Sequence, residues 1–436
     1  MTGFGNYRKL AFAPLQEQRG VQDELLREHV AWCLNRSPFY ASRLAGLEPA
    51  CLTQATMASL PTTTKADLER CNDEFLAVPP AQIVDIVLSS GTTGKPTRIM
   101  YTERDLQRLA YNEEMAFSAC GMTSADVVLL TCTMDRCFVA GLAYFLGIRS
   151  IGAAAIRNGH GSLESHLGVI RQMKPTALVG VPSFLRKLGQ YVAGEGIDPR
   201  TAGVRRLICI GEPLRGRDMA LLKLGLDLEA LWGARVHSTY ASSETVTTFC
   251  ECTAQCGGHL APELAVVEIL DDHGVALPPG AVGEVTVTPL ATEGMPLIRF
   301  RTGDISFLLA ERCACGRGSP RLGPILGRRQ QMLKVRGTTL YPQALYSALD
   351  EIQGIGEYYV EVRDTEVLSD DIAVHVALSD AGVTAGAIQE KLQARVRVKP
   401  AVLVDPEDQV RARVFDPRSR KPLRFFDLRK KNAQLS

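Results

Sequence analysis

The chain has 436 residues, a formal net charge of +1, 46% hydrophobic residues and 22% charged residues. This is the composition of an ordinary globular protein with ample apolar material for a core, and the length suits one large domain with a smaller one, or two to three domains. A charge near zero provides no global field for nucleic acid or an acidic membrane surface, so neither is an expected partner.

Three features of the chain bear on where the protein works. The N-terminal stretch MTGFGNYRKLAF has no apolar core of the signal-peptide type, so no secretory signal is predicted. The most apolar long window, 138–156, is interrupted by Arg149 and several glycines, which indicates a buried helix and strand instead of a membrane span. Twelve cysteines without a signal peptide argue against a disulfide framework and for a reducing compartment, so we expect a cytoplasmic protein.

The first three quarters of the chain alternate short apolar runs with helical patterns. Four runs predict buried strands: Ile83–Leu88, Val127–Thr131, Ala177–Val181 and Leu207–Ile210. Residues from 102 to about 120 predict a helix, because Thr102 and Asp105 have the spacing of a capping box. Ser183–Val192 predicts another helix, with Ser183 as its N-cap. Such alternation is typical of an α/β domain with at least partly parallel sheet.

The sequence pattern changes twice toward the C-terminus. From Glu263 it favours strands without long helices, and beyond the segment LGRRQQMLKVRG it favours a compact α+β unit of about a hundred residues. Two helices and two strands are predicted in that unit: Gln343–Ile352, Ala385–Val396, Tyr358–Arg363 and Ile372–Leu378. The expected fold is therefore α/β, with a large N-terminal domain over 1–327 that includes a strand-rich section, and a small α+β domain over 328–436.

A glycine- and hydroxyl-rich segment, SSGTTGKP, follows the first predicted strand, at 89–96. Successive backbone N–H groups in such a segment can converge on an anion, usually phosphate, and glycine lets the chain approach closely. The segment is not a Walker loop, because only two residues separate its glycines and Pro96 follows Lys95. Taken by itself, it is also compatible with a polar hairpin turn.

Five further motifs follow in order along the chain: GEP at 211–213, YASSE at 240–244, RFRTGD at 299–304, GRRQQMLKVRG at 327–337 and KPLRFFDLR at 421–429. Together with SSGTTGKP, they resemble the adenylate-forming superfamily of acyl- and aryl-CoA ligases, and most of all its phenylacetate–CoA ligase branch. The resemblance extends from near residue 80 to the C-terminus. It implies a large AMP-binding domain over 1–327 and a mobile C-terminal domain over 328–436.

The resemblance also implies a reaction. An ATP-dependent ligase activates a carboxylic acid, here expected to be aromatic, as an acyl-adenylate with release of pyrophosphate. It then transfers the acyl group to CoA with release of AMP. Two alternatives remain open at this stage: a stand-alone adenylation protein that loads a carrier-protein thiol, and a nucleotide-binding protein that has lost turnover. The expected partners are the small-molecule acid, ATP and CoA, and a homodimer is an open alternative to a monomer.

Residue by residue, the resemblance implies an ATP site in the large domain. The cradle for the β- and γ-phosphates comprises Ser89, Ser90, Gly91, Thr92, Thr93, Gly94 and Lys95. Glu244 is implied to be a catalytic carboxylate that coordinates Mg²⁺, which suits a hard cation. Tyr240 is implied to pack on the adenine, and Asp304 to accept hydrogen bonds from the ribose hydroxyls. Further nucleotide contacts are implied for Gly211, Glu212, Pro213, Ser243 and Arg328.

The C-terminal motifs imply two tasks for the small domain. Lys421 is implied to be the catalytic lysine of the adenylation step, in a GK..R..D.R context in which Arg420 stands where glycine is usual. The segment from Lys334 to Gly337 is implied to help form the thiol tunnel for CoA.

Two positions depart from the family pattern. The hinge carries Gln330 and Gln331 where an aspartate is usual, and domain rotation survives this if the hinge need only absorb φ/ψ changes. Ala241 replaces the usual glycine after the motif tyrosine, which is expected to narrow the acyl pocket.

A cysteine-rich pattern predicts a metal site. Cys252, His259, Cys313 and Cys315 supply four soft or borderline ligands, a set that suits tetrahedral Zn²⁺. Some phenylacetate–CoA ligase relatives resemble this pattern. Cys250 and Cys256 are spare candidates, and a cluster of reduced, packed cysteines is the alternative. We expect the zinc to be structural and not catalytic.

The segment TMDRCFVAG, after the strand Val127–Thr131, is implied to line the acyl pocket. Asp135 and Arg136 are unusual neighbours for a simple phenyl ring. Either these two side chains pair with each other, or Arg136 meets a second polar group on the substrate. The sequence does not identify the acid.

Overall fold

A computed structural model describes residues 4–89, 97–335, 338–364, 370–380, 382–415 and 422–429. The chain divides into two compact units, Met1–Ile325 and Leu326–Ser436. The boundary expected between residues 327 and 328 lies close to this division.

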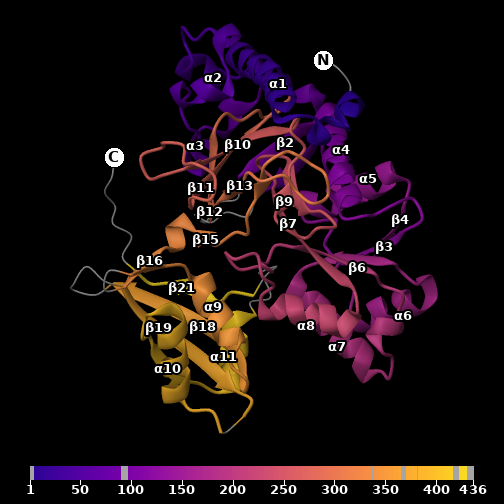
Figure 1. Ribbon diagram of the computed structural model, residues 1–436, viewed down its shortest axis with the longest axis vertical. Helices are drawn as coiled ribbons and strands as arrows, with labels where there is room; N and C mark the ends of the chain where they lie inside the picture. Colours follow the sequence, from indigo (N-terminus) through magenta and orange to yellow (C-terminus); the bar gives the residue numbers. More distant parts are fainter. Residues whose placement is uncertain are drawn as a thin grey trace. The chain divides into compact units, whose positions relative to one another are not determined.

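The N-terminal part of the first unit is helical, and the sequence pattern had predicted no element there. It contains α1 (Leu15–Arg36), α2 (Pro38–Arg43) and α3 (Lys65–Arg70), joined by short 3-10 turns (Figure 1). The rings of Phe39 and Phe75 stack at 4.0 Å in its core. This core also includes Leu297 and Phe300, so the helical part packs on the strand-rich section.

The main sheet of the first unit is mixed. Its strand order is β13-β14-β9-β8-β7-β6-β5-β3-β4, and the strands from β7 through β4 pair in parallel. The parallel strands are β3 (Val127–Leu130), β4 (Ala154–Arg157), β5 (Ala177–Gly180), β6 (Arg206–Ile210) and β7 (Arg235–Ser242). The antiparallel strands are β8 (Thr247–Glu251), β9 (Gly258–His259), β13 (Leu308–Leu309) and β14 (Arg321–Leu322). The predicted α/β fold with partly parallel sheet is confirmed.

Helices cover both faces of the parallel strands. Val128 and Leu130 pack with α4 (Glu103–Ala119) and α5 (Val139–Ile151), whereas Leu129 packs with the helices on the opposite face. Those helices are α6 (Leu163–Met173), α7 (Pro182–Gly194) and α8 (Lys223–Trp232), which are grouped in Figure 1. Successive side chains of a strand point to opposite faces, so strands buried on both faces are continuous apolar runs.

The helix starts test two predictions. Thr102 and Asp105 form the expected capping box at the start of α4. The N-cap predicted at Ser183 is wrong, because α7 begins at Pro182 and Val181 is its N-cap. Proline suits the first position of a helix, where its missing N–H is not needed.

The strand predicted at Ile83–Leu88 exists as β1, but the expectation that it is buried is wrong. It pairs with β2 (Arg98–Thr102) in a two-stranded ribbon, and it leaves Val84 54% and Ile86 51% exposed. The strand-rich section contains the antiparallel neighbours β10 (Ala265–Leu270), β11 (Gly283–Pro289) and β12 (Phe300–Ser306).

The second unit is an α+β structure. Its sheet has the order β20-β19-β18-β21, and α9 and α10 contribute Leu345, Leu349, Ile388 and Leu392 to a core with that sheet. The two predicted helices and two predicted strands are all present. The elements are β15 (Gly327–Arg328), β16 (Leu333–Val335), β17 (Thr338–Leu340), α9 (Pro342–Asp350), β18 (Ile355–Asp364), β19 (Asp370–Leu378), α10 (Ala385–Val396), β20 (Ala401–Val404), α11 (Glu407–Val414) and β21 (Phe425–Asp427).

Candidate active site

Tyr240 and Asp304 are joined across the first unit. Tyr240 lies near the end of β7 and donates a hydrogen bond from its hydroxyl to Asp304 Oδ2 at 2.7 Å. Burial, together with the Asp304 charge, raises the pKa of Tyr240 well above its ordinary value, so the phenol remains a donor. Gly303, just before Asp304, has φ +78°, a conformation that glycine adopts without strain. Two residues predicted to contact one nucleotide are thus neighbours.

Glu244 sits between a hydroxyl and a cation. Ser242 Oγ donates to Glu244 Oε2 at 2.6 Å, and Lys65 Nζ lies 3.4 Å from Glu244 Oε1. The Glu244 side chain is 11% exposed and the Lys65 side chain 21%, so solvent screens this pair less than a surface pair. Lys65 is the first residue of α3, whose N-cap is Thr64. Lys65 lies outside all six sequence motifs, so no motif predicted its place in the site.

A strained turn follows Glu244, and a buried arginine hydrogen-bonds to its backbone. Val246 has φ +48°, which a β-branched side chain rarely adopts. The fully buried Arg108 donates to the carbonyl oxygens of Val246, Leu264 and Leu290. Burial lowers the pKa of Arg108 to about 10, which still leaves it charged at neutral pH. The Arg108 guanidinium therefore joins the turn after the motif to the chain at Leu264 and at Leu290.

The acidic side chain of the motif at 211–213 binds the N-terminal end of α7. Glu212 accepts hydrogen bonds from the backbone N–H of Ser183 at 2.9 Å and from its hydroxyl at 2.8 Å. A carboxylate at the first turn of α7 satisfies a backbone donor there and complements the helix dipole. Gly211 has φ +78°, which turns the chain at the end of β6. The Glu212 carboxylate is therefore occupied by Ser183, and the nucleotide contact expected of Glu212 stays a prediction.

The predicted phosphate segment is anchored at both described ends. Ser89 N–H donates to the Thr97 carbonyl at 2.9 Å, and both side chains are buried. Neither hydroxyl has a hydrogen-bond partner among the described residues. Tyr101 extends from β2 and donates to the Ser243 carbonyl at 2.8 Å, which ties this ribbon to the YASSE motif. The remaining cradle residues lie outside the described residues: Ser90, Gly91, Thr92, Thr93, Gly94 and Lys95.

The second unit holds the other predicted contacts. Arg328 and Lys334 belong to it, and the Lys334 backbone N–H donates to Asp370 Oδ2 at 2.6 Å. Lys421 and Gly337 lie outside the described residues.

The motif residues that follow Lys421 act as a scaffold within the second unit. Arg429 pairs with Asp427 at 2.7 Å and with Asp370 at 3.2 Å. The Arg424 guanidinium lies 4.4 Å from the centre of the Tyr358 ring. These contacts fasten the C-terminal motif to the small sheet.

The segment expected to line the acyl pocket carries both polar neighbours on its exposed part. Thr133 Oγ1 donates to Asp135, and this bond, with the Arg136 charge, keeps the pKa of Asp135 below its ordinary value. No ion pair joins Asp135 to Arg136 among the described residues. Arg136 and Cys137 both have positive φ, at 58° and 53°.

The predicted metal ligands meet at the edge of the main sheet. One donor atom each from Cys252, His259, Cys313 and Cys315 lies within 4.8 Å of the others. Cys252 Sγ is 3.6 Å from Cys313 Sγ, and Cys315 Sγ is 3.4 Å from His259 Nε2. Cys250 and Cys256 are not in this group.

The chemistry of the group fits a metal. Burial, with the charges of Arg317 and Arg321, lowers the pKa of His259 to about 3, so its imidazole is neutral as a ligand must be. Arg317 donates to Cys315 Sγ at 3.4 Å. Burial raises the pKa of Cys252 to about 12, a cost that a bound cation would offset by favouring the thiolate.

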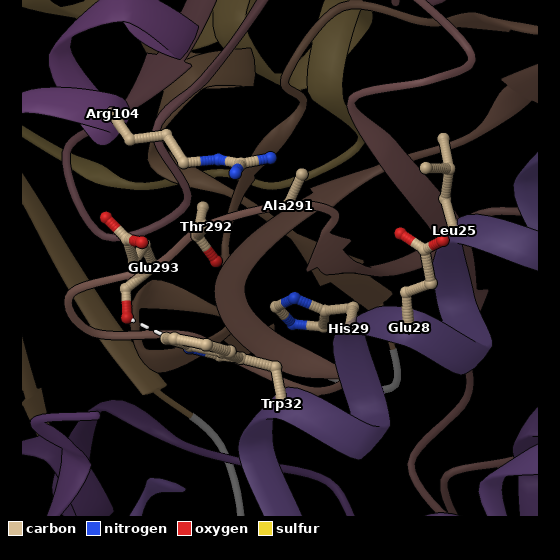
Figure 2. A pocket seen from close by; sticks show the side chains of 8 residues that line it. All are labelled: Leu25, Glu28, His29, Trp32, Arg104, Ala291, Thr292 and Glu293. Carbon is tan, nitrogen blue, oxygen red and sulfur yellow. Dashed lines mark hydrogen bonds between the residues drawn. The ribbon is translucent and has the colours of Figure 1, made fainter. Parts of the chain in front are cut away.

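A separate small pocket lies between α1 and the loop that precedes β12. Figure 2 shows the Arg104 guanidinium and the His29 ring on opposite sides of it. His29 Nδ1 and Thr292 Oγ1 are buried without a hydrogen-bond partner among the described residues. Its volume of about 20 Å³ leaves room for roughly one water molecule. The pocket is too small for a nucleotide or an aromatic acid.

Comparison with known proteins decides the family. The family model for AMP-binding enzymes matches residues 35–289. The chain belongs to the AMP-binding enzyme family. It is 30% identical over 380 residues to phenylacetate–coenzyme A ligase of Thermus thermophilus, across 85% of this chain and 84% of the relative. It is 29% identical to the Escherichia coli enzyme of the same name, across 96% of each chain. The predicted phenylacetate–CoA ligase branch is confirmed.

Solved structures agree on the fold. A crystal structure of 2-hydroxyisobutyryl-CoA ligase in its postadenylation state superposes with a TM-score of 0.82 at 21% identity, covering 96% of this chain and 90% of that one. ATP-bound MatB from Rhodopseudomonas palustris gives 0.60 at 19% identity, covering 76% and 66%. Together with the family model and the relatives, this confirms the predicted reaction class: the enzyme activates a carboxylic acid with ATP and then transfers the acyl group to CoA.

Within the described part of the chain, no helix is both long and apolar enough to cross a bilayer.

Proposed function

We propose that the enzyme activates an aromatic carboxylic acid and that Tyr240, Asp304, Glu244 and Lys65 bind the ATP. The observation that carries this assignment is that three chain segments converge on the YASSE motif. Tyr240 reaches Asp304 at 2.7 Å, Lys65 reaches Glu244 at 3.4 Å, and Tyr101 holds Ser243. Relatives named phenylacetate–coenzyme A ligase support an aromatic acid for this chain as well.

In this proposal each side chain has one task. Asp304 accepts hydrogen bonds from the ribose hydroxyls, and Tyr240 both orients Asp304 and packs on the adenine. Glu244 would hold Mg²⁺, and when bound the ion would neutralise phosphate charge. Lys65 adds a second positive charge beside the phosphates, which favours departure of pyrophosphate. The backbone at Gly211 and Pro213 lines the nucleobase pocket, with Ser89 to Lys95 as the phosphate cradle.

The second unit is proposed to serve both half-reactions. Lys421 stabilises the charge that grows as the acyl-adenylate forms, and Lys334 to Gly337 bind the CoA thiol arm, with Arg328 at the hinge. Free CoA is the proposed acceptor, against a carrier-protein thiol. The cytoplasmic location and the homodimer remain predictions.

A structural Zn²⁺ held by Cys252, His259, Cys313 and Cys315 is also proposed. It would fasten the end of β8 to the loop between β13 and β14, because its ligands come from both segments. The nearby chain supports a structural role: Gly318 N–H donates to the Ala11 carbonyl at 2.8 Å, so the N-terminal segment is fixed to the same loop.

The test is a panel of carboxylic acids incubated with ATP, Mg²⁺ and CoA. We expect AMP, pyrophosphate and a thioester in equal amounts with at least one aromatic acid. Glu244→Gln should raise the Mg²⁺ concentration needed for half-maximal rate with little change in melting temperature. Formation of ADP instead of AMP would refute the mechanism, and AMP without any CoA thioester would favour a carrier protein as acceptor.

A further inference from the structure

A carboxyl group is buried in the core between α4, α5 and the main sheet. Glu113, in the middle of α4, is 1% exposed. Its Oε1 accepts hydrogen bonds from Thr248 Oγ1 and, at 3.3 Å, from Asn112 Nδ2. Its Oε2 is buried and has no hydrogen-bond partner among the described residues. A buried polar atom without a partner is costly, so its presence calls for an explanation.

Packing closes one side of this carboxyl group. A Cβ atom built on Gly147 of α5 would lie 2.3 Å from Glu113 Cβ, so α5 approaches more closely than any other residue type would allow. The surrounding apolar cluster contains Val139, Ala143 and Tyr144. The α5 backbone at Gly147 therefore leaves no room for a hydrogen-bond partner of Glu113 Oε2 on that side.

Glu113 is linked through Thr248 to the YASSE motif. Thr248, which donates to Glu113, is the register partner of Ala241 on β7. Directly opposed residues of an antiparallel pair project their side chains to the same face, about 5 Å apart. Ala241 is exposed and lies between Tyr240 and Glu244, that is, between the proposed adenine contact and the proposed metal ligand.

A second segment brings Glu113 to the same place. Cys132 directly precedes the segment expected to line the acyl pocket, and it is buried. Burial raises the pKa of Cys132 to about 12, and the Glu113 charge adds to that rise, so the two groups are close. Glu113 is therefore linked to two segments, one at Ala241 and one at Cys132, that are expected to border the acyl pocket.

We propose that Glu113 is a specificity-determining residue of the acyl pocket, and that the acid carries a hydroxyl or amino group which hydrogen-bonds to Glu113 Oε2. This inference rests on the proposed function. Oε1 already accepts from two donors, whereas Oε2 has no partner among the described residues. Burial raises the pKa of Glu113 to about 7, so above neutral pH the group is a carboxylate and the partner that Oε2 lacks is a donor. Aromatic acids that carry a ring hydroxyl or amino group supply one, whereas the unsubstituted acids leave the carboxyl group unsatisfied.

The chain offers a matched control for Glu113. Glu263 is also buried, accepts one hydrogen bond from Tyr111 at 2.5 Å, and has an Oε2 without a partner among the described residues. Its hydrogen bond comes from Tyr111 on α4 and the Arg108 charge is nearby, whereas the described residues show no hydrogen bond between Glu263 and Thr248. Replacing either glutamate removes one buried acid. Of the two, Glu113 is the one that is hydrogen-bonded to Thr248, the strand partner of Ala241.

The experiment measures kcat/KM for AMP formation with benzoate, phenylacetate and the ring-hydroxylated and ring-aminated forms of each. At pH 8, where Glu113 is ionised, we expect the wild type to prefer a substituted acid to its parent by about tenfold or more, the effect of one buried hydrogen bond to a charged group. Glu113→Leu should bring the ratio of kcat/KM values for substituted and parent acids to near one. Glu113→Gln should lower that ratio most for the ring-aminated acids. Glu263→Gln should retain it.

Binding provides a readout that does not depend on turnover. Acyl-sulfamoyl adenosines made from a preferred acid and from its parent are titrated into each protein by calorimetry. Their affinity ratio should follow the kinetic preference in the wild type and in Glu263→Gln, and vanish in Glu113→Leu. If a preference survives in folded Glu113→Leu, or if the wild type has none, the inference is wrong and the proposed function stands. If no acid yields AMP, the proposed function is wrong and the inference falls with it.

Discussion

Lys65 Nζ lies 3.4 Å from Glu244 Oε1, although the two residues are far apart in the chain. The contact joins the N-terminal helical part of the first unit to the end of β7. Thr64 and Asp67 form a capping box that fixes the start of α3, so the position of Lys65 is set by the helix and not by a loop. An ammonium group held beside the proposed metal ligand is placed to meet the charge of a polyphosphate.

Replacing Lys65 by Met should therefore slow acyl-adenylate formation by about 10²–10³-fold, the usual effect of losing one preorganised donor to developing charge. The measurement is pyrophosphate release in single-turnover mixtures with the preferred acid. The matched control is Lys223→Met, because the exposed Lys223 side chain pairs with Asp227 on α8, outside the proposed site, and should not matter. Equal rates in the two variants would remove Lys65 from the mechanism.

The metal group makes a compositional prediction. Protein purified without chelator should contain one zinc per chain by elemental analysis. Cys313→Ser should lose the metal and unfold more easily by several kcal/mol, because binding energy at a structural site is folding energy. The control is Cys51→Ser, which changes an exposed cysteine. A zinc content near zero, with unaltered melting of Cys313→Ser, would show that the cysteines are simply packed and reduced.

Glu263 makes a prediction about pH and stability. Burial raises its pKa to about 7, partly offset by its hydrogen bond from Tyr111, against an ordinary value of 4.5. Between those two values the folded protein holds a proton that the unfolded chain has lost, so this residue favours folding less as pH rises. Glu263→Gln, which cannot ionise, should gain up to roughly 3 kcal/mol relative to the wild type between pH 4.5 and 7.5. Urea unfolding of both proteins across that range measures it, and a constant difference would contradict the shifted pKa.

How far the sequence predicts this fold depends on what each element buries. β3, β5 and β6 are buried on both faces and are therefore short apolar runs, which made them predictable. β7 was not predicted, because the motif strand RVHSTYAS presents polar groups to the site. α1 was missed as well, since polar Gln18 and His29 interrupt its buried stripe. Elements that build the site are thus the least regular ones.

The site was predictable wherever a motif is local and not where it depends on folding. Tyr240, Asp304 and the four metal ligands could be assigned from ordered motifs, and the structure brings the partners of each set together. Lys65 and Glu113 could not be assigned, because a lysine at a helix start and a glutamate in a helix are ordinarily solvated. Their surroundings come from segments distant in sequence.

Lys421 and Gly337 allow the two half-reactions to be separated. Lysine is a compact point charge, suited to stabilise negative charge that grows as the carboxylate attacks the α-phosphate. Lys421→Ala should therefore slow acyl-adenylate formation by about 10²–10³-fold. The same variant, supplied with a presynthesised acyl-adenylate and CoA, should form the thioester at close to the wild-type rate. Gly337→Trp should do the reverse, since a bulky side chain would block the proposed thiol tunnel.

The control for this pair is Arg424→Met, which removes a contact that fastens the same motif to the small sheet. Arg424 lies over the Tyr358 ring and pairs with Glu357 at 3.1 Å, so its loss should loosen the motif as a whole. We expect that variant to lower the melting temperature and to slow adenylation through disorder, and the conservative Arg424→Lys to restore part of the melting temperature. Lys421→Ala should leave the melting temperature unchanged, because a charge that acts only in the transition state contributes nothing to the folded ground state. Equal losses in both half-reactions for Lys421→Ala, together with a lowered melting temperature, would make Lys421 a structural residue like Arg424.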